Sequence, residues 1–210
     1  MTGRFISLEG GEGVGKSTQL EALRGELERR GIDCLVTREP GGSEGAEAIR
    51  ELLLTGENAR WSMAAEALLF AAARADHVEK AIRPALEQGQ WVLSDRFIDS
   101  SLAYQGEAGG FGLDRVRELH RIATGGFYPD RTLVLSLAEG HERAKARDRD
   151  TLDRIGGRPD DFHQRVELAF RTIAAEEPER VRLVDASGTR EEVTRRLVEA
   201  IADLLPESAP

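Results

Sequence analysis

The sequence predicts an α/β fold, in which a five-stranded parallel sheet carries helices on both faces and a short arginine-rich lid. Five short apolar runs alternate with helical patterns, and this repetition implies right-handed crossovers between parallel strands. The runs are nearly continuous in apolar residues, which is typical of strands buried on both faces. Because 210 residues suit one domain, we expect residues 1–210 to form a single domain, with the lid at approximately 145–160.

The expected elements follow one another along the chain. Strands are expected at 4–8, 34–36, 91–93, 133–135 and 181–184. Helices are expected from Lys16 to near Gly31, over 63–87, and over 114–123. The last helix begins with the capping-box pattern Thr189-x-x-Glu192 and is expected to run to about Leu205.

Composition narrows the function classes. The formal net charge of -9 argues against a general nucleic-acid-binding surface. The single cysteine, Cys34, excludes an intrachain disulfide and a multi-cysteine metal site. The N-terminus has no signal-peptide pattern, and no apolar run is long enough to cross a bilayer. We therefore expect a cytoplasmic protein with no nucleic-acid or membrane partner.

A glycine-rich segment lies between the first strand and the first helix. It comprises Gly10, Gly11, Glu12, Gly13, Val14, Gly15, Lys16, Ser17 and Thr18. Its Gly-x-x-x-x-Gly-Lys-Ser spacing in this context matches the phosphate-binding loop (P-loop), so we expect the P-loop NTPase fold. The glycines let backbone N–H groups turn toward a polyphosphate, and the helix dipole adds positive potential. Lys16 is expected to reach the outer phosphates, and Ser17 to hold Mg²⁺.

Two further strand ends carry charged residues. Ligands bind beyond the carboxyl ends of parallel strands, so Arg38, in the segment 37–42, is placed to meet an anionic group. An ordinary turn with a solvated Arg-Glu pair explains this segment equally well. At the third strand, Asp95 suits the orientation of hydrated Mg²⁺ and Arg96 a bidentate grip on a second phosphate. A surface ion pair is the alternative, which the upstream P-loop disfavours.

Two other patterns are less specific by themselves. Phe70 and Arg74 are four residues apart on one helix face, and a ring beside a guanidinium suits a nucleobase. Considered alone, a residue such as Phe70 more often packs in the core, and one such as Arg74 more often lies on the solvated surface. An arginine-rich segment can close as a lid over transferring phosphate, although an exposed mixed-charge helix is commoner. Its basic residues are Arg143, Lys145, Arg147, Arg149 and Arg154.

Together these stretches resemble the thymidylate kinase family over nearly the whole chain. The matching segments are Glu9-Gly10, 37–42 (TREPGG), Phe70 with Arg74, 95–105, 128–130, the basic lid and 152–155. The resemblance implies phosphorylation of dTMP to dTDP by ATP with Mg²⁺, through direct in-line transfer, in a cytoplasmic homodimer. Because the P-loop has no arginine, the chain is similar to the branch whose catalytic arginines come from the lid.

The resemblance also implies roles for individual residues. ATP would be bound by the P-loop residues Gly10 to Thr18, and the metal by Ser17 and Asp95. The dTMP-binding residues would be Glu12, Arg38, Glu39, Pro40, Phe70, Arg74, Arg96, Ser100, Ser101, Tyr104 and Gln105. The catalytic residues would be Lys16, Arg96, Arg147, Arg149 and Arg154.

Two alternatives stay open from the sequence. One is a P-loop kinase that acts on another nucleoside monophosphate or on a small alcohol. The other is a nucleotide-binding regulator such as a GTP-dependent switch. Such switches commonly read guanine with an Asn-Lys-x-Asp segment, yet the only asparagine, Asn58, is followed by Ala59.

Overall fold

Five parallel strands form the centre of the molecule in the order β2-β3-β1-β4-β5. The computed structural model describes residues 3–137 and 153–206. The strands are β1 (Phe5–Gly10), β2 (Cys34–Arg38), β3 (Trp91–Asp95), β4 (Arg131–Ser136) and β5 (Val181–Asp185). All four pairings are parallel. The predicted five-stranded parallel sheet is therefore confirmed.

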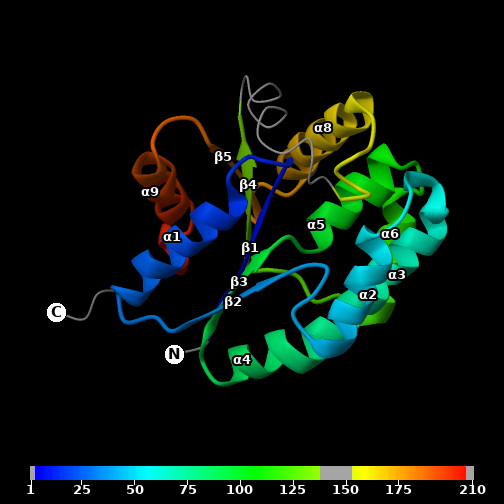
Figure 1. Ribbon diagram of the computed structural model, residues 1–210. Helices are drawn as coiled ribbons and strands as arrows, with labels where there is room; N and C mark the ends of the chain where they lie inside the picture. Colours follow the sequence, from blue (N-terminus) through cyan, green and yellow to red (C-terminus); the bar gives the residue numbers. More distant parts are fainter. Residues whose placement is uncertain (1–2, 138–152, 207–210) are drawn as a thin grey trace.

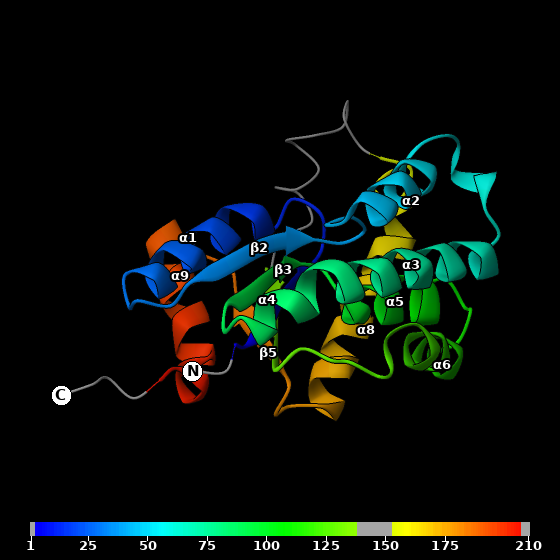
Figure 2. The same cartoon turned by 90° about the horizontal axis from the view of Figure 1, so that it is seen from below.

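Helices cover both faces of this sheet, as predicted (Figure 1). The helices are α1 (Lys16–Glu28), α2 (Glu44–Leu54), α3 (Met63–His77), α4 (Arg83–Glu87), α5 (Ile98–Ser101), α6 (Leu113–Thr124), α8 (Asp160–Glu176) and α9 (Arg190–Ala200). Figure 2 shows α1 and α9 on one side of the sheet and α2, α3, α5, α6 and α8 on the other. Neighbouring residues of a strand point to opposite faces of the sheet. Accordingly, Phe5 packs into one core cluster and Ile6 into the other.

The strand ends place two charged residues side by side. The strands extend beyond the apolar runs seen in the sequence, so β2 ends at Arg38 and β3 at Asp95. These two residues are direct partners in the parallel register, and Leu8 of β1 is opposite Asp95 on the other side. The P-loop leaves β1 at the same edge. The sheet therefore gathers the P-loop, Arg38 and Asp95 at the carboxyl ends of its three adjoining strands.

Several helices differ from the sequence prediction. The single helix expected over 63–87 is divided, because a π-helical turn (Val78–Ile82) separates α3 from α4. Helices α2 and α8 were not predicted. The last helix ends at Ala200 and not near Leu205, and a short 3₁₀ turn (Ala202–Leu204) follows it. None of the helices in the described part of the chain is both long and apolar enough to cross a bilayer.

The capping box at the start of α9 is confirmed and gives a stability prediction. Thr189 Oγ1 accepts a hydrogen bond from Glu192 N at 3.2 Å, and Glu192 Oε2 accepts one from Thr189 N at 2.7 Å. We expect Thr189→Ala to lower the free energy of unfolding by about 1 kcal/mol, since it leaves a helix N–H unpaired. Urea unfolding measures this loss. Thr189→Ser keeps the hydroxyl and serves as the control; an equal loss in both variants would contradict the capping role.

Candidate active site

A cavity of about 430 Å³ opens at the carboxyl edge of the sheet, between the P-loop, β2, β3, α3 and α5. Most of the residues expected to bind ligands line it together. They are Glu12, Gly13, Gly15, Lys16, Ser17, Thr18, Arg38, Glu39, Pro40, Phe70, Arg74, Asp95, Arg96, Ser100, Ser101, Tyr104 and Gln105. Three P-loop residues, Gly10, Gly11 and Val14, do not line the cavity.

The P-loop has the backbone conformation that its glycines permit. Gly10, Gly13 and Gly15 have φ angles of 133°, 69° and 97°, which L side chains rarely adopt. A Cβ at Gly10 would lie only 2.5 Å from the carbonyl oxygen of Leu135 on β4. The loop therefore needs glycine at Gly10 for two reasons, its φ angle and its contact with the neighbouring strand.

Lys16 folds back over the P-loop. Its Nζ donates to the carbonyl oxygens of Gly11 at 2.7 Å and Gly10 at 3.2 Å, and the residue is only 7% exposed. Burial, aided by the nearby Arg96 guanidinium, lowers the pKa of Lys16 to about 8. The ammonium is thus held at the cavity wall by two neutral backbone carbonyls, and it is available to an anionic ligand.

Ser17 and Asp95 bring two kinds of oxygen ligand together. The Ser17 hydroxyl donates to Asp95 Oδ2 at 3.0 Å, which joins the first turn of α1 to the end of β3. Hydroxyl and carboxylate oxygens are the ligands that Mg²⁺ prefers. Among the described residues, no group of three His, Cys, Asp or Glu side chains could hold a metal. These two oxygens fit a hydrated Mg²⁺ ion, which the Ser17 hydroxyl would bind directly and the Asp95 carboxylate through a water molecule, with phosphate supplying further ligands.

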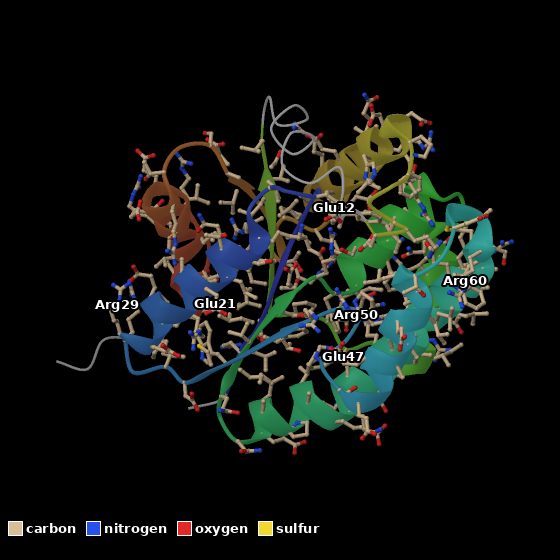
Figure 3. The ribbon with its side chains drawn as sticks, in the orientation of Figure 1. Glu12, Glu21, Arg29, Glu47, Arg50 and Arg60 are labelled. Carbon is tan, nitrogen blue, oxygen red and sulfur yellow. The ribbon has the colours of Figure 1, made fainter. Side chains whose placement is uncertain are left out.

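Arg96 lies at the centre of the cavity wall, with a φ angle of 71°. Its Nη1 donates to Ser100 Oγ at 3.0 Å and to the Gly10 carbonyl at 3.3 Å, and its Nη2 donates to Glu12 Oε1 at 2.5 Å. The guanidinium carbon lies 5.1 Å from the centroid of the Tyr104 ring. The Arg96 guanidinium beside Glu12 holds the pKa of that carboxyl below its ordinary value. Glu12 lies in the loop after β1 in Figure 3.

Glu9 fastens the segment after β3 to the strand that leads into the P-loop. Its Oε1 accepts hydrogen bonds from Phe97 N at 2.8 Å and Ser100 N at 3.3 Å, and its Oε2 accepts one from Ser100 Oγ at 2.6 Å. The side chain is fully buried. Burial, together with the nearby carboxylate of Asp99, raises the pKa of Glu9 to about 7, although Arg96 and the hydrogen bonds oppose the rise.

This raised pKa predicts a pH-dependent stability. Since the folded-state pKa of about 7 lies above the ordinary value of 4.5, the folded protein binds this proton more tightly than the unfolded chain does. The stabilising contribution is fully present below pH 4.5 and is lost as pH rises through about 7. Gln at this position does not titrate. We therefore expect the unfolding free energy of wild type, minus that of Glu9→Gln, to decrease as pH rises from 4.5 to about 7. A difference that does not change with pH would contradict the assignment.

The other end of the cavity carries the aromatic and guanidinium pair of α3. Arg74 donates from Nε to Glu39 Oε2 at 2.8 Å and from Nη2 to Ser101 Oγ at 2.9 Å and to the Phe97 carbonyl at 3.2 Å. Phe70, one helical turn before it, is partly buried and packs beside the apolar core. The face predicted from the spacing of these two residues does line the cavity.

The model of one protein family matches most of this chain. It is the thymidylate kinase model, and it covers residues 8–197. The chain belongs to the thymidylate kinase family.

Individual proteins support this assignment. The chain is 57% identical to a thymidylate kinase of Rhizorhabdus wittichii, in a match that covers 98% of this chain and 100% of that protein. It is 49% identical to one of Rhodopseudomonas palustris (strain TIE-1), covering 100% and 93%. The crystal structure of the thymidylate kinase from Ehrlichia chaffeensis superimposes with a TM-score of 0.78 at 28% identity, covering 96% of this chain and 100% of that one.

The basic residues of the lid expected in this thymidylate kinase family member divide into two groups. Arg143, Lys145, Arg147 and Arg149 lie outside the described residues. Arg154 is described, but it does not line the cavity. Its Nε donates to the Leu53 carbonyl at 2.7 Å, and its Nη2 pairs with the buried carboxylate of Glu66. In this arrangement Arg154 is held against α2 and α3, and the structure does not place it on the cavity wall.

Sequence reasoning missed several residues that line the cavity. They are Arg50, Leu54, Phe97, Asp153 and Ile155. Arg50, which lies on α2 with Glu47 (Figure 3), donates to the Pro40 carbonyl at 2.6 Å. Glu47 meanwhile pairs with Arg38 at 3.0 Å. No local pattern singled out Arg50, because α2 itself was not predicted. Phe97 directly follows Asp95 and Arg96, and this position in the sequence could have indicated that it lines the same cavity.

Proposed function

We propose that this chain transfers the γ-phosphoryl group of ATP to dTMP, which gives dTDP and ADP. A phosphate oxygen of dTMP attacks the γ-phosphorus in line, and the bond to the β–γ bridging oxygen breaks. The observation that carries the proposal is the two-ended cavity. A P-loop with Lys16 lies at one end, the Phe70 and Arg74 pair at the other, and Arg96 between them. Membership of the thymidylate kinase family supports the same reaction.

The ATP end consists of the P-loop and the start of α1. Backbone N–H groups from Gly10 to Thr18 and the Lys16 ammonium would bind the phosphates of ATP. Ser17 would bind Mg²⁺ directly and Asp95 through a water molecule, and the ion would neutralise phosphate charge. Lys16 needs only to leave the carbonyls of Gly10 and Gly11 to meet the outer phosphates.

The dTMP end supplies cations and a planar surface. Arg96 and Arg38 would bind the dTMP phosphate, and Arg50 adds a third guanidinium to this wall. Phe70 would stack on thymine, while Arg74 and Ser101 hydrogen-bond its edge. Tyr104 would lie against the sugar, where it disfavours a 2′-hydroxyl, and Glu12 would face the 3′-hydroxyl. Glu39, Pro40, Ser100 and Gln105 would complete the wall of the pocket.

Catalysis would rest on positioning and on charge neutralisation, because phosphoryl transfer needs little covalent chemistry from the protein. Two anions must approach each other, and Lys16 and Arg96 offset their repulsion. By resemblance, Arg147 and Arg149 of the lid would neutralise charge on the transferring group. The lid would also exclude water that otherwise hydrolyses ATP. Arg154 pairs with the buried carboxylate of Glu66.

We also propose that residues 1–210 form a single cytoplasmic domain that assembles as a homodimer through α3. Leu68 on α3 is 55% exposed and Ile122 on the adjacent α6 is 68% exposed. Large apolar side chains on neighbouring helices suit a contact between copies. Sedimentation of wild type and Leu68→Glu tests this assembly; identical sedimentation of the two proteins would argue against it.

An acceptor comparison tests the substrate. ADP release is measured with dTMP, dUMP, dCMP and AMP at equal concentrations, and we expect dTMP to be used fastest. Equal rates across these acceptors would favour a kinase for another monophosphate. Preferential binding of GTP without any phosphoryl acceptor would favour a nucleotide-binding regulator.

A further inference from the structure

A buried histidine stands behind the base-binding end of the cavity. His77 is the last residue of α3, is fully buried, and does not line the cavity. Its Nε2 lies 2.7 Å from Thr37 Oγ1, and its Nδ1 lies 3.2 Å from Glu39 Oε1. The ring thus joins the end of β2 to the acidic residue that follows it.

The contacts of Glu39 define the direction of these hydrogen bonds. Its carboxylate forms an ion pair with Arg74, whose Nε donates to Oε2 at 2.8 Å. An ionised carboxylate only accepts hydrogen bonds, so His77 Nδ1 is the donor to Oε1. The other ring nitrogen, Nε2, forms the hydrogen bond with the Thr37 hydroxyl. Thr37, His77, Glu39 and Arg74 therefore form one continuous chain of hydrogen bonds, in which Thr37 is half-buried and the other three side chains are buried.

This chain determines where the guanidinium of Arg74 points. Nε is engaged by Glu39, and Nη2 by Ser101 and the Phe97 carbonyl. Nη1 has no hydrogen-bond partner among the residues that the structure describes, although Arg74 lines the cavity. Nη1 is thus the nitrogen left for a ligand. Its position depends on the rotation of the Glu39 carboxylate, which His77 holds from behind.

We propose that His77 is a positioning residue for the nucleobase, which acts through Glu39 on Arg74 and never touches the nucleotide. The inference rests on the proposed function, because it takes thymine as the group that meets Arg74. Buried partners that orient a binding group make a site selective, since the group is held in place before the ligand arrives.

The same network explains two residues of the segment 37–42 that substrate binding leaves without a role. Thr37 holds the ring of His77 by its hydroxyl. Gly42 has a φ of 86°, and a Cβ there would lie 2.3 Å from His77 Nε2 and 2.4 Å from Thr37 Oγ1. Only glycine leaves room for the contact between these two side chains. Both residues therefore serve the placement of His77.

Two substitutions separate the two contacts of His77. In His77→Asn the amide nitrogen overlays Nδ1 and keeps the donor to Glu39. In His77→Gln the amide reaches the place of Nε2 and keeps the contact with Thr37, but it loses the donor. We expect His77→Gln to raise the KM for dTMP about tenfold, with an unchanged KM for ATP, since a buried acceptor of Glu39 is left unpaired. His77→Asn should restore the dTMP KM to within about twofold of wild type.

A double-mutant cycle shows whether the effect passes through Arg74. In an Arg74→Met background, His77→Gln should raise the dTMP KM no further. The control for general destabilisation is His120→Gln, another buried histidine, which should lower the melting temperature without changing the dTMP KM. The inference would be overturned if His77→Gln left the dTMP KM unchanged, or if His77→Gln and His77→Asn gave the same KM. It would also be overturned if His77→Gln raised the dTMP KM by the same factor with and without Arg74→Met. If the wild type did not phosphorylate dTMP at all, the proposed function itself would be wrong. If the wild type phosphorylated dTMP but the variants behaved as just described, only the inference about His77 would be wrong.

Discussion

Lys16→Ala is expected to lower kcat by about 10²–10³-fold, the usual effect of removing one donor to the charge that develops on a reacting group. Lys16 is buried in the P-loop, and its hydrogen-bond partners among the described residues are the backbone carbonyls of Gly10 and Gly11. Its ammonium can therefore move to the β- and γ-phosphates at low cost. The variant should retain the fold and the affinity for dTMP, because Lys16 lies at the opposite end of the cavity from Phe70 and Arg74. Steady-state kinetics, circular dichroism and a dTMP titration measure these three properties.

Lys80→Ala is the matched control for this substitution. Lys80 is exposed in the π-helical turn after α3, and within the described part of the chain its ion pair is with Asp76, so its loss should leave turnover unchanged. If Lys16→Ala turned over at the rate of Lys80→Ala, the P-loop would not hold the reacting phosphates, and the ATP end of the cavity would be assigned wrongly.

Arg96→Ala is expected to lower kcat/KM for dTMP by about 10²–10³-fold, while ATP affinity changes far less. The Arg96 guanidinium joins the P-loop carbonyl of Gly10, the Ser100 hydroxyl and the Glu12 carboxylate. Its loss leaves that carboxylate facing an incoming phosphate. Separate titrations with dTMP and with ATP resolve the two affinities.

Arg96→Lys separates charge from shape at this position. A lysine keeps the positive charge but lacks the planar fork that grips phosphate and carboxylate together, so it should recover only a small part of the lost kcat/KM. Full recovery by lysine would mean that charge alone matters at this position. A loss of ATP affinity as large as the loss of dTMP affinity would move Arg96 to the ATP end of the cavity.

The sequence predicted the sheet and the P-loop because their signals are local. The five apolar runs became the five strands, and the glycines of the P-loop take backbone angles that only they adopt readily. Arg38, Asp95 and Arg96 were predicted to lie at the ligand-binding edge of the sheet because they follow the carboxyl ends of parallel strands, and this rule needs no side-chain detail. Phe70 and Arg74 followed from helical spacing alone.

Contacts between distant parts of the chain could not be predicted in this way. Arg154 was predicted to be a catalytic arginine of the lid, yet it is buried against Glu66. Glu66 also accepts hydrogen bonds from Arg158 at 2.6 Å and from Gln105 at 2.9 Å. Charged residue types predict solvent exposure, and only tertiary packing shows that these are enclosed. His77 is a similar case, because a lone histidine gives no signal of its contact with Glu39, 38 residues earlier.

The fate of the γ-phosphate of ATP tests the account most directly. ATP labelled at this position is incubated with the protein, Mg²⁺ and dTMP, and the labelled products are separated. The account predicts that label appears in dTDP at the same rate as ADP forms, and that both stop when dTMP is omitted. Label that appears in inorganic phosphate at a rate independent of dTMP would contradict it.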